Sequence, residues 1–376
     1  MPGPAPQSPI LVRPLSVAEL AAVLTDTLAR LSPTRLSIVS DQLRAILHSD
    51  RPSDLLAMAA LPSEEALDAG IIAIATLPEN GDTGTILHVD WARPGNHPDP
   101  KTRGPQQNND RADFARQACR PLRDRMTEWM FGRGVRFVQW ATDPIKTHPD
   151  GSPLPIELPA ETTHPGPAEW GVLMQFENIG TLDYLAVDTF ETALPCPTKP
   201  AIVLSPLEQR SPTETKDFES LVSQTYQGSL DCPNLESYRR TDQILESYRC
   251  VGSYAPDLWF SVHLADQNDH PKAADAIGCC LLARHTNSES QELVLELVYM
   301  GIIPSHRGKG LGKQVMQLIS RIGEQHNATR LVLAVDQNNH PALAAYQRFG
   351  MKPLFSETVW IRSLPDDRNP TNQLQH

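Results

Sequence analysis

Three glycines within five residues constrain this chain more than any other feature. The segment 306–313 has the sequence His-Arg-Gly-Lys-Gly-Leu-Gly-Lys. It follows an apolar run that predicts a strand over 293–303 and precedes an amphipathic stripe that predicts a helix over 311–325. Glycines at such a junction let the backbone turn tightly and bring its N–H groups close to a ligand, and the helix start adds a positive dipole end. The sequence therefore predicts an anion site that suits a pyrophosphate.

Two common nucleotide-binding loops do not fit this segment. A Walker A loop, GxxxxGK[ST], would need glycine at 303 and a hydroxyl residue at 310, but the chain has Ile303 and Gly310. A dinucleotide loop, GxGxxG, would need glycine at position 313, which is Lys313. The pattern that remains is RGxGxG.

A second pattern follows downstream: Asn339-x-x-Ala342-x-x-x-Tyr346-x-x-Phe349-Gly350-Met351. Together with RGxGxG after a strand that ends in Gly-Ile-Ile-Pro, it resembles the motifs of the GNAT superfamily of acyl-CoA-dependent acetyltransferases. The resemblance covers residues 291–353 and departs from the family at Met351, where Phe is commoner.

The resemblance implies a role for each motif. The backbone amides of 307–312 would hold the pyrophosphate of acetyl-CoA, with Lys309 and Lys313 adding positive charge. The Tyr346 hydroxyl would protonate the leaving thiolate, and the strand backbone over 300–302 would polarise the acetyl carbonyl. No metal is required. The implied contacts with acetyl-CoA are Met300, Ile302, Ile303, Arg307, Gly308, Lys309, Gly310, Leu311, Gly312, Lys313 and Asn339.

Glu296 is the candidate general base. It is the one charge within the apolar run 293–300, where a charge is costly unless it is paired or functional. It also precedes Ile302 by the spacing at which several superfamily members place their base. The alternatives are a solvated strand face for Glu296 and a plain core position for Tyr346.

The amine acceptor is expected at the loop 226–233, between the first two helices of the second half. Tyr226 and Asp231 are the candidate contacts, and an ordinary capped loop is the alternative. The formal net charge of −12 fits a cationic acceptor and argues against nucleic acid as a partner.

Proline clusters divide the 376-residue chain. We expect a leader over 1–12, a first domain over 13–195, a second over 196–364 and a polar tail over 365–376. Expected elements of the first half are helices over 15–31 and 112–131 and strands over 71–76, 85–91, 135–140, 172–176 and 182–187. Those of the second half are helices over 215–226, 235–248, 311–325 and 341–349 and strands over 258–264, 277–283, 293–303, 331–335 and 359–364.

The order of helices and strands expected in the second half is also found, less clearly, in the first half. We therefore predict an α/β fold of two tandem GNAT-like domains, each a mixed, largely antiparallel sheet flanked by helices. In the first half, the equivalent loop over 94–109 has prolines without N–H donors and no glycine triplet. This half is expected not to bind coenzyme A, and either to shape the acceptor pocket or to brace the second half.

Composition narrows the remaining choices. The six cysteines have no CxxC spacing, so neither a disulfide framework nor a zinc site is expected. No apolar run approaches the ~18–20 residues needed to cross a bilayer, and the start lacks a signal-peptide pattern. We expect a cytoplasmic protein without a membrane partner. The duplication favours a monomer, although the sequence leaves the oligomeric state open.

The leading functional hypothesis is an acetyl-CoA-dependent N-acetyltransferase that acts on a small amine or a protein amino group. One alternative is an enzyme like the mycothiol synthases, which join a weak and an active half. Another is a regulatory module that binds coenzyme A without turnover. Glu296 and Tyr346 favour catalysis over the last of these.

Overall fold

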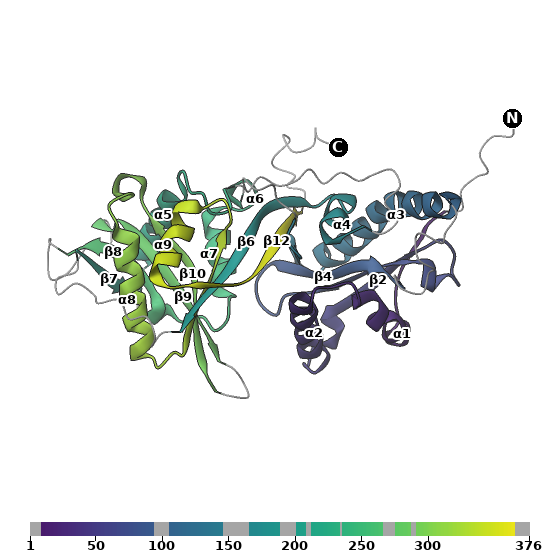
Figure 1. Ribbon diagram of the computed structural model, residues 1–376, viewed down its shortest axis with the longest axis horizontal. Helices are drawn as coiled ribbons and strands as arrows, with labels where there is room; N and C mark the ends of the chain where they lie inside the picture. The colour runs from purple at the N-terminus through teal and green to yellow at the C-terminus, as the bar shows by residue number, and fades with distance from the viewer. Residues whose placement is uncertain are drawn as a thin grey trace. The chain divides into compact units, whose positions relative to one another are not determined.

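The chain forms two compact units in a computed structural model (Figure 1). The structure describes residues 9–93, 105–145, 165–188, 201–207, 212–233, 235–265, 275–286 and 291–364. Unit 1 contains the residues up to Ile179 and those from Glu357 onward. Unit 2 contains Gly180–Ser356.

The described residues of the first half form ten α-helices and β-strands. They are β1 (Leu11–Pro14), α1 (Val17–Leu28), α2 (Pro33–Leu47), β2 (Leu55–Leu61), β3 (Ile71–Thr76), β4 (Thr83–Trp91), α3 (Pro105–Phe131), β5 (Phe137–Thr142), α4 (Pro167–Leu173) and β6 (Glu177–Asp188). The sheet of unit 1 has the strand order β1-β2-β3-β4-β5-β12, and only the β4–β5 pair is parallel among the described pairs.

The second half repeats this order with an extra short helix. Its elements are β7 (Ile202–Pro206), α5 (Pro212–Tyr226), α6 (Leu235–Tyr238), α7 (Thr241–Arg249), β8 (Trp259–Leu264), β9 (Gly278–Thr286), β10 (Leu293–Ile302), α8 (Leu311–Gln325), β11 (Arg330–Asp336), α9 (His340–Phe349) and β12 (Lys352–Ser363). The sheet of unit 2 has the order β7-β8-β9-β10-β11-β6, and only its β10–β11 pair is parallel among the described pairs.

Matching strand registers support a duplication. In unit 2 the β9–β10 register shifts at Val298, and in unit 1 the β3–β4 register shifts at Leu87. In each unit the parallel pairing ends directly before this bulge, at Leu297 and at Ile86. A bulge is a specific local feature, so its recurrence at the same place is stronger support than element order alone. The predicted fold class, an α/β fold with a mixed, largely antiparallel sheet flanked by helices, is confirmed.

Each unit completes its sheet with a strand from the other half of the sequence. Residues Thr358–Ser363 of β12 pair with β5 in unit 1, and residues Leu182–Asp188 of β6 pair with β11 in unit 2. The compact units therefore divide the chain differently from the proline-based boundary after residue 195.

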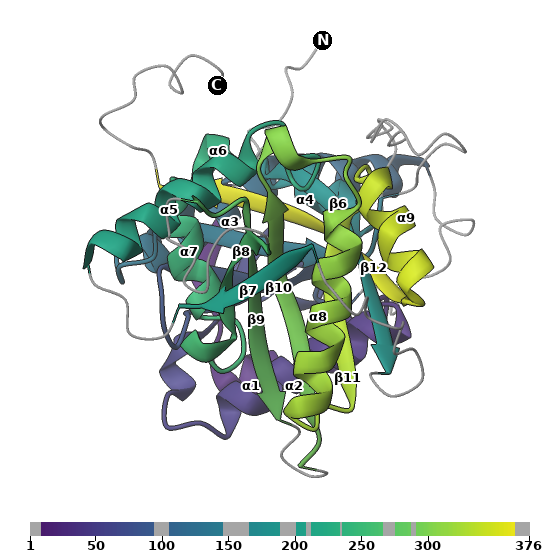
Figure 2. The same ribbon diagram turned by 90° about the vertical axis from the view of Figure 1, so that its left-hand side faces the viewer.

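Helices cover both faces of each sheet. In unit 1, α1 and α2 bury Val23 and Val39 on one face, and α3 buries Leu122 and Met126 on the other. In unit 2, α8 and α9 bury Val315 and Phe349 on one face. Helices α5 and α7 pack on the opposite face (Figure 2). The helices leave the carboxyl end of β10 uncovered, where the chain passes through a loop into α8.

Three expectations for the elements were wrong. Residues 105–109, expected within the loop 94–109, instead begin α3. The segment 172–176, predicted as a strand, instead spans the end of α4 and the turn after it. Helix α4 starts with Pro167 at its first position, and the Glu169 carboxylate accepts a hydrogen bond from the Gly166 N–H, which favours a helix start. The helix predicted over 235–248 is divided into α6 and α7.

Sequence patterns also missed α2, which Ser32 caps and Pro33 begins. The predicted tail, most of the predicted leader and residues 94–104 of the first-half loop lie outside the described residues. Among the helices that the structure describes, none combines the length and apolarity required to cross a bilayer.

The strand exchange generates a prediction about fragments. A fragment of residues 177–356 retains β6 beside β11 and should fold cooperatively. A fragment of residues 196–364 lacks β6 and leaves Val359, Trp360 and Ile361, which are buried in unit 1, without their core. Because an unpaired edge and exposed apolar residues promote aggregation, this fragment should aggregate or unfold at lower temperature. Size-exclusion chromatography and thermal circular dichroism measure both effects, and equal stability of the fragments would contradict the exchange.

Candidate functional site

The glycine loop of unit 2 lies between β10 and α8 and presents free donors. Gly308 and Gly310 have φ of 72° and 74°, in the left-handed region that glycine adopts without strain. Gly310 is the N-cap of α8, and a Cβ at either glycine would meet no atom within 4 Å. No residue in the described ranges accepts a hydrogen bond from the N–H groups of 308–312. The structure thus places open backbone donors at a helix start, and their use as an anion site stays a prediction.

The strands beside this loop separate. Residues 294–297 of β10 pair with β11, whereas Ala334–Asp336 continue along β6 without a partner on β10 in the described chain. The bulge at Val298 turns the end of β10 away from β11. Met300 and Ile302, both expected to contact acetyl-CoA, lie on this separated end, and Ile303 follows it.

Arg307 braces the loop with its side chain. Its guanidinium donates to the carbonyls of Ile302 (2.8 Å), Thr225 (2.7 Å) and Gly228 (3.0 Å). Two of these carbonyls lie at the end of α5 and just after it, where unpaired carbonyls and the helix dipole favour a cation. The side chain of Arg307 thus joins the glycine loop to the start of the predicted acceptor loop, while its backbone N–H donates to Pro304.

Tyr346 projects from α9 into the core shared with α8. Its side chain is buried, and burial raises the pKa of its hydroxyl well above the ordinary tyrosine value. Among the residues that the structure describes, the Tyr346 hydroxyl has no hydrogen-bond partner. The Asn339 side chain caps α9 by accepting from the nearby Ala342 N–H at 3.4 Å, and its contact with acetyl-CoA stays a prediction.

Glu296 lies on the α5–α7 face of the sheet. Its neighbours Leu295 and Leu297 point into the α8–α9 core, so strand alternation places Glu296 on the opposite face. There its carboxylate lies 2.7 Å from Nε2 of His285 on β9. The two side chains are only partly exposed, 25% for Glu296 and 40% for His285. Sequence patterns found Glu296 but missed its partner.

The two candidate acceptor residues have structural partners. Tyr226 is buried, stacks on Tyr299 with ring centroids 4.9 Å apart, and shares a 2.6 Å hydrogen bond with the hydroxyl of Tyr248. Asp231 accepts from the Asp336 N–H at 2.9 Å, and burial raises the pKa of its carboxyl. These contacts fix the loop 227–233 against the end of β11.

The tyrosine group around Tyr299 was missed by sequence analysis. Tyr299 donates to or accepts from Thr225 at 2.9 Å and stacks on Tyr248 as well as on Tyr226. Its only sequence signal was an aromatic residue in a strand, which does not reveal its neighbours. The group gives the separated end of β10 a rigid aromatic wall on the α5–α7 face.

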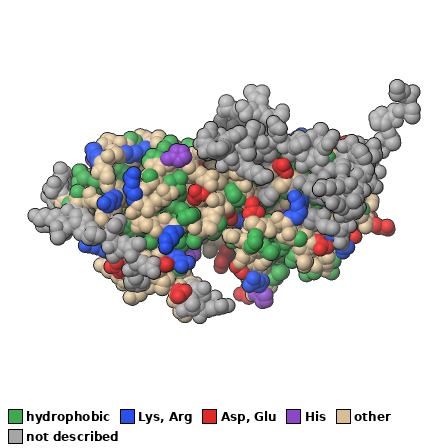
Figure 3. Space-filling view, in the orientation of Figure 1, with side chains coloured by type: hydrophobic (Ala, Val, Ile, Leu, Met, Phe, Trp, Pro, Cys, Tyr) green, Lys and Arg blue, Asp and Glu red, His purple; other side chains and the backbone are tan. Residues whose placement is uncertain are grey.

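Positive charge surrounds the open donors of the glycine loop. Lys309 and Lys313 are exposed beside the open N–H groups, and Figure 3 shows Lys and Arg side chains on the face of unit 2 that carries α8 and α9. Anions are stabilised at such a helix start by the dipole and the donors together. A linear ligand held there can follow the gap between β10 and β11.

Part of the chain matches a known protein family. Residues 224–351, about a third of the chain, match the family model described as "Acetyltransferase (GNAT) family". The match contains the glycine loop, Glu296 and Tyr346.

Similar curated proteins align over short stretches. The "Putative [ribosomal protein bS18]-alanine N-acetyltransferase" of Bacillus subtilis (strain 168) is 34% identical over 58 residues, which is 15% of this chain and 38% of that protein. The "Mycothiol acetyltransferase" of Corynebacterium glutamicum (strain R) is 32% identical over 65 residues, which is 17% of this chain and 22% of that protein. The chain thus spans well under half the length of either relative.

Among solved structures, a "Tandem GNAT protein from the clavulanic acid biosynthesis pathway" aligns with 14% identity and a TM-score of 0.44, covering 96% of this chain and 100% of that chain. A "GCN5-related N-Acetyltransferase from Sphaerobacter thermophilus" aligns with 14% identity and a TM-score of 0.44, covering 94% of this chain and 95% of that chain.

Proposed function

We propose that this chain, whose residues 224–351 form a domain of the GNAT acetyltransferase family, transfers the acetyl group of acetyl-CoA to an amine. One observation carries the proposal more than any other. The glycine loop offers consecutive N–H donors without acceptors in the described chain, directly beside the separated ends of β10 and β11. A pyrophosphate satisfies these donors, and the gap between the strands accommodates the pantetheine arm.

The chemistry then requires an acid and a base on either side of the thioester. Tyr346 supports the acid role, because its hydroxyl has no hydrogen-bond partner among the described residues and can donate to a thiolate. The proton of its hydroxyl passes to the thiolate sulfur as the C–S bond breaks. Glu296 supports the base role through its carboxylate, which takes the proton that the amine releases as the C–N bond forms. His285 holds that carboxylate in place.

Most of the rate should come from positioning. The bulge at Val298 aims the backbone of 300–302 at the reacting carbonyl, where an N–H can polarise its oxygen. Arg307 joins the loop that holds one substrate to the loop that faces the other. Holding two substrates in a reactive arrangement converts a bimolecular step into an effectively unimolecular one.

The acceptor is proposed to be a primary amine, either of a small molecule or of a protein N-terminus. The relative from Bacillus subtilis, named as an alanine N-acetyltransferase, favours an amino group of protein. A second candidate is the amine of a thiol sugar, which the likeness to mycothiol acetyltransferases over 65 residues favours. A screen of peptides, amino acids, polyamines and thiol sugars with detection of released coenzyme A separates these classes.

Acetyl-CoA should stabilise the intact chain. At about 100 times its Kd, a ligand adds about 2.7 kcal/mol, which corresponds to a Tm increase of about 5–10 °C for a unit of this size. Gly310→Glu should abolish the increase because it places a like charge in front of the pyrophosphate donors. Differential scanning calorimetry measures both.

The matched control is Gly134→Glu. Gly134 has φ of 88° and also has no atom within 4 Å of an added Cβ, so the two variants share backbone strain and added charge. The control should keep the ligand-induced increase. A Gly310→Glu variant that retains the full increase would refute the pyrophosphate site.

Tyr346→Phe should lower kcat by about 10²-fold, in the range that positioned general acids contribute. The Kd for acetyl-CoA should change little because only the hydroxyl is removed. Steady-state kinetics and calorimetric titration separate the two quantities. Tyr184→Phe, in which the ring stacked on Phe355 also loses a hydroxyl, is the control. Wild-type turnover in Tyr346→Phe would remove Tyr346 from the acid role.

Glu296→Gln should lower kcat/KM and change its dependence on pH, because the amide cannot take the proton that the amine releases. The measurement is a profile of kcat/KM against pH. Glu292→Gln, an exposed position just before the same strand, should leave the profile unchanged. An identical profile in Glu296→Gln would assign the proton to water or to another residue.

A further inference from the structure

Unit 1 contains a pocket at the place that corresponds to the gap in unit 2. Strands β4 and β5 pair only through Thr83–Ile86 and then separate after the bulge at Leu87. The pocket at this separation is small and partly open to solvent. Its position between the separated strands repeats the geometry of the acetyl-CoA site, but its lining is different.

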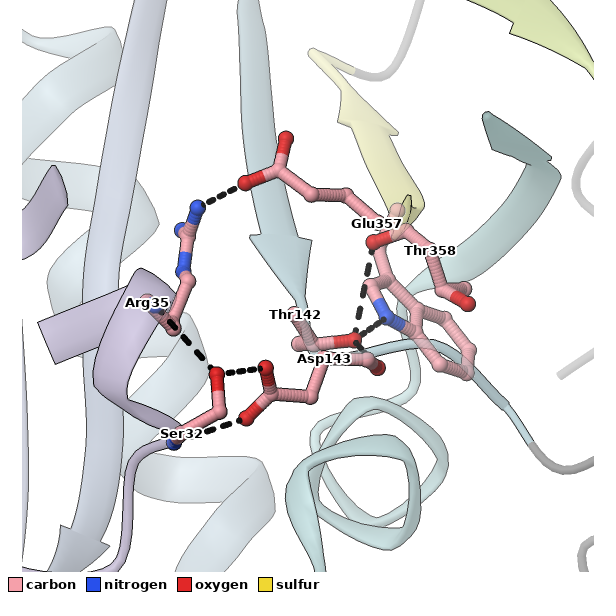
Figure 4. Close-up of polar contacts among 7 residues, drawn as sticks. Ser32, Arg35, Thr142, Asp143, Glu357 and Thr358 are labelled. Carbon is pink, nitrogen blue, oxygen red and sulfur yellow. Dashed lines mark hydrogen bonds and ion pairs between the residues drawn. The ribbon is translucent and has the colours of Figure 1, made fainter. Parts of the chain in front are cut away.

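Paired charges line this pocket in place of glycine and tyrosine. By register, His88 and Asp90 stand where unit 2 has Tyr299 and Gly301. Asp90 is buried and pairs with Arg30 at 3.1 Å. Arg35 is also buried and pairs with Glu357 of β12 (Figure 4).

A third carboxylate lies beside these pairs. Asp143 follows β5 and accepts from the Ser32 hydroxyl at 2.6 Å (Figure 4). The same Ser32 caps α2, so the α1–α2 connection is fixed against the pocket. With Arg30 and Arg35 against three carboxylates, the group differs from neutrality by a single charge. A polyanion such as a pyrophosphate is therefore a poor match for it.

Two donor side chains of this pocket, Trp170 and Arg35, have N–H groups that are not used in hydrogen bonds within the described residues. The indole N–H of Trp170, a side chain that is 1% exposed, has no acceptor at hydrogen-bonding geometry, although it is close enough to Asp90 to lower the pKa of that carboxyl. Arg35 uses one guanidinium nitrogen for Glu357, and its side chain has no other acceptor in the described ranges. Donors of this kind in a buried pocket match a carboxylate, which Arg binds in bidentate geometry.

Two side chains of the pocket, His88 and Asp90, can also accept further hydrogen bonds. Burial lowers the pKa of His88 to about 4, with Arg35 and Arg30 acting in the same direction, so the ring is neutral at neutral pH. Its Nε2 lies 2.9 Å from the Thr27 carbonyl and must donate to it, which leaves the lone pair on Nδ1. Burial raises the pKa of Asp90 to about 6 despite the opposing effect of Arg30. A cationic donor beside Asp90 would stabilise its ionised form.

We propose that this pocket of unit 1 binds a free α-amino acid, with the carboxylate on Arg35 and the Trp170 N–H and the ammonium toward Asp90 and Nδ1 of His88. A zwitterion matches the near-neutral set of paired charges, and its two groups match the remaining donors and acceptors. Aromatic rings of Trp140 and Trp170 in the same lining suit an ammonium group as well. The proposal concerns unit 1 alone and does not rest on the acetyltransferase activity of unit 2.

Isothermal titration calorimetry of the full chain with each standard amino acid tests the proposal, without acetyl-CoA present. At least one amino acid should bind with a Kd below about 1 mM. For that amino acid, the matched amine without the carboxylate and the matched acid without the amine should each bind at least about tenfold more weakly.

Two variants test whether the amino acid binds in this pocket. Trp170→Phe removes one donor and keeps a ring, and Asp90→Asn removes the carboxylate charge; each should weaken binding about tenfold. Trp129→Phe, a partly buried tryptophan on α3 that does not line the pocket, is the control and should bind as the wild type. Circular dichroism confirms that each variant folds, and Trp170→Phe remains informative if Asp90→Asn does not fold.

The remaining outcomes would overturn the proposal. These are no binding by any amino acid at about 10 mM, equal binding of the amine or acid analogue, and binding that Trp170→Phe leaves unchanged. In the first case the ion pairs serve only the stability of unit 1. In the last case the amino acid occupies another site, such as the acceptor position of unit 2.

Discussion

The site depends on a one-residue register shift in β10. Because Val298 has no partner on β9, the strand bends there, and its parallel pairing with β11 stops at Leu297. The separated ends cannot satisfy each other's backbone groups, and buried backbone groups need partners. The glycine loop, the start of α8 and the buried Tyr346 all surround this separation, so a continuous β10–β11 pair would leave them nothing to enclose.

The same register shift occurs beside two different sets of side chains, one in each unit. In unit 2 the residue two positions past Tyr299 is Gly301, where an added Cβ would lie only 2.5 Å from the Thr225 side chain. In unit 1 the equivalent position is Asp90, whose charge requires Arg30 as a partner.

Local sequence patterns predicted most helices and strands of unit 2. They did not predict the pairing of strands that lie far apart in the sequence. The helix over 311–325 matches α8 because a glycine triplet and an apolar stripe are both local. Glu296 could be named as a candidate, but its partner His285 follows from the β9–β10 register, which the sequence does not specify. The apolar run 172–176 is short enough to suit a strand or a helix, and Pro167 decides for the helix. The two last strands have similar patterns, so nothing local indicates that β6 and β12 are exchanged.

That exchange has a consequence for biosynthesis. Thr142 of β5 pairs with Thr358, 216 residues later, so the sheet of unit 1 has no final strand when β5 leaves the ribosome. At ordinary translation rates of about 5–20 residues per second, the edge of β5 waits about 10–40 s for β12. An open strand edge during that interval is exposed to pairing with other nascent chains. The yield of this protein in cells should therefore depend on chaperones and elongation rate more than its final stability suggests.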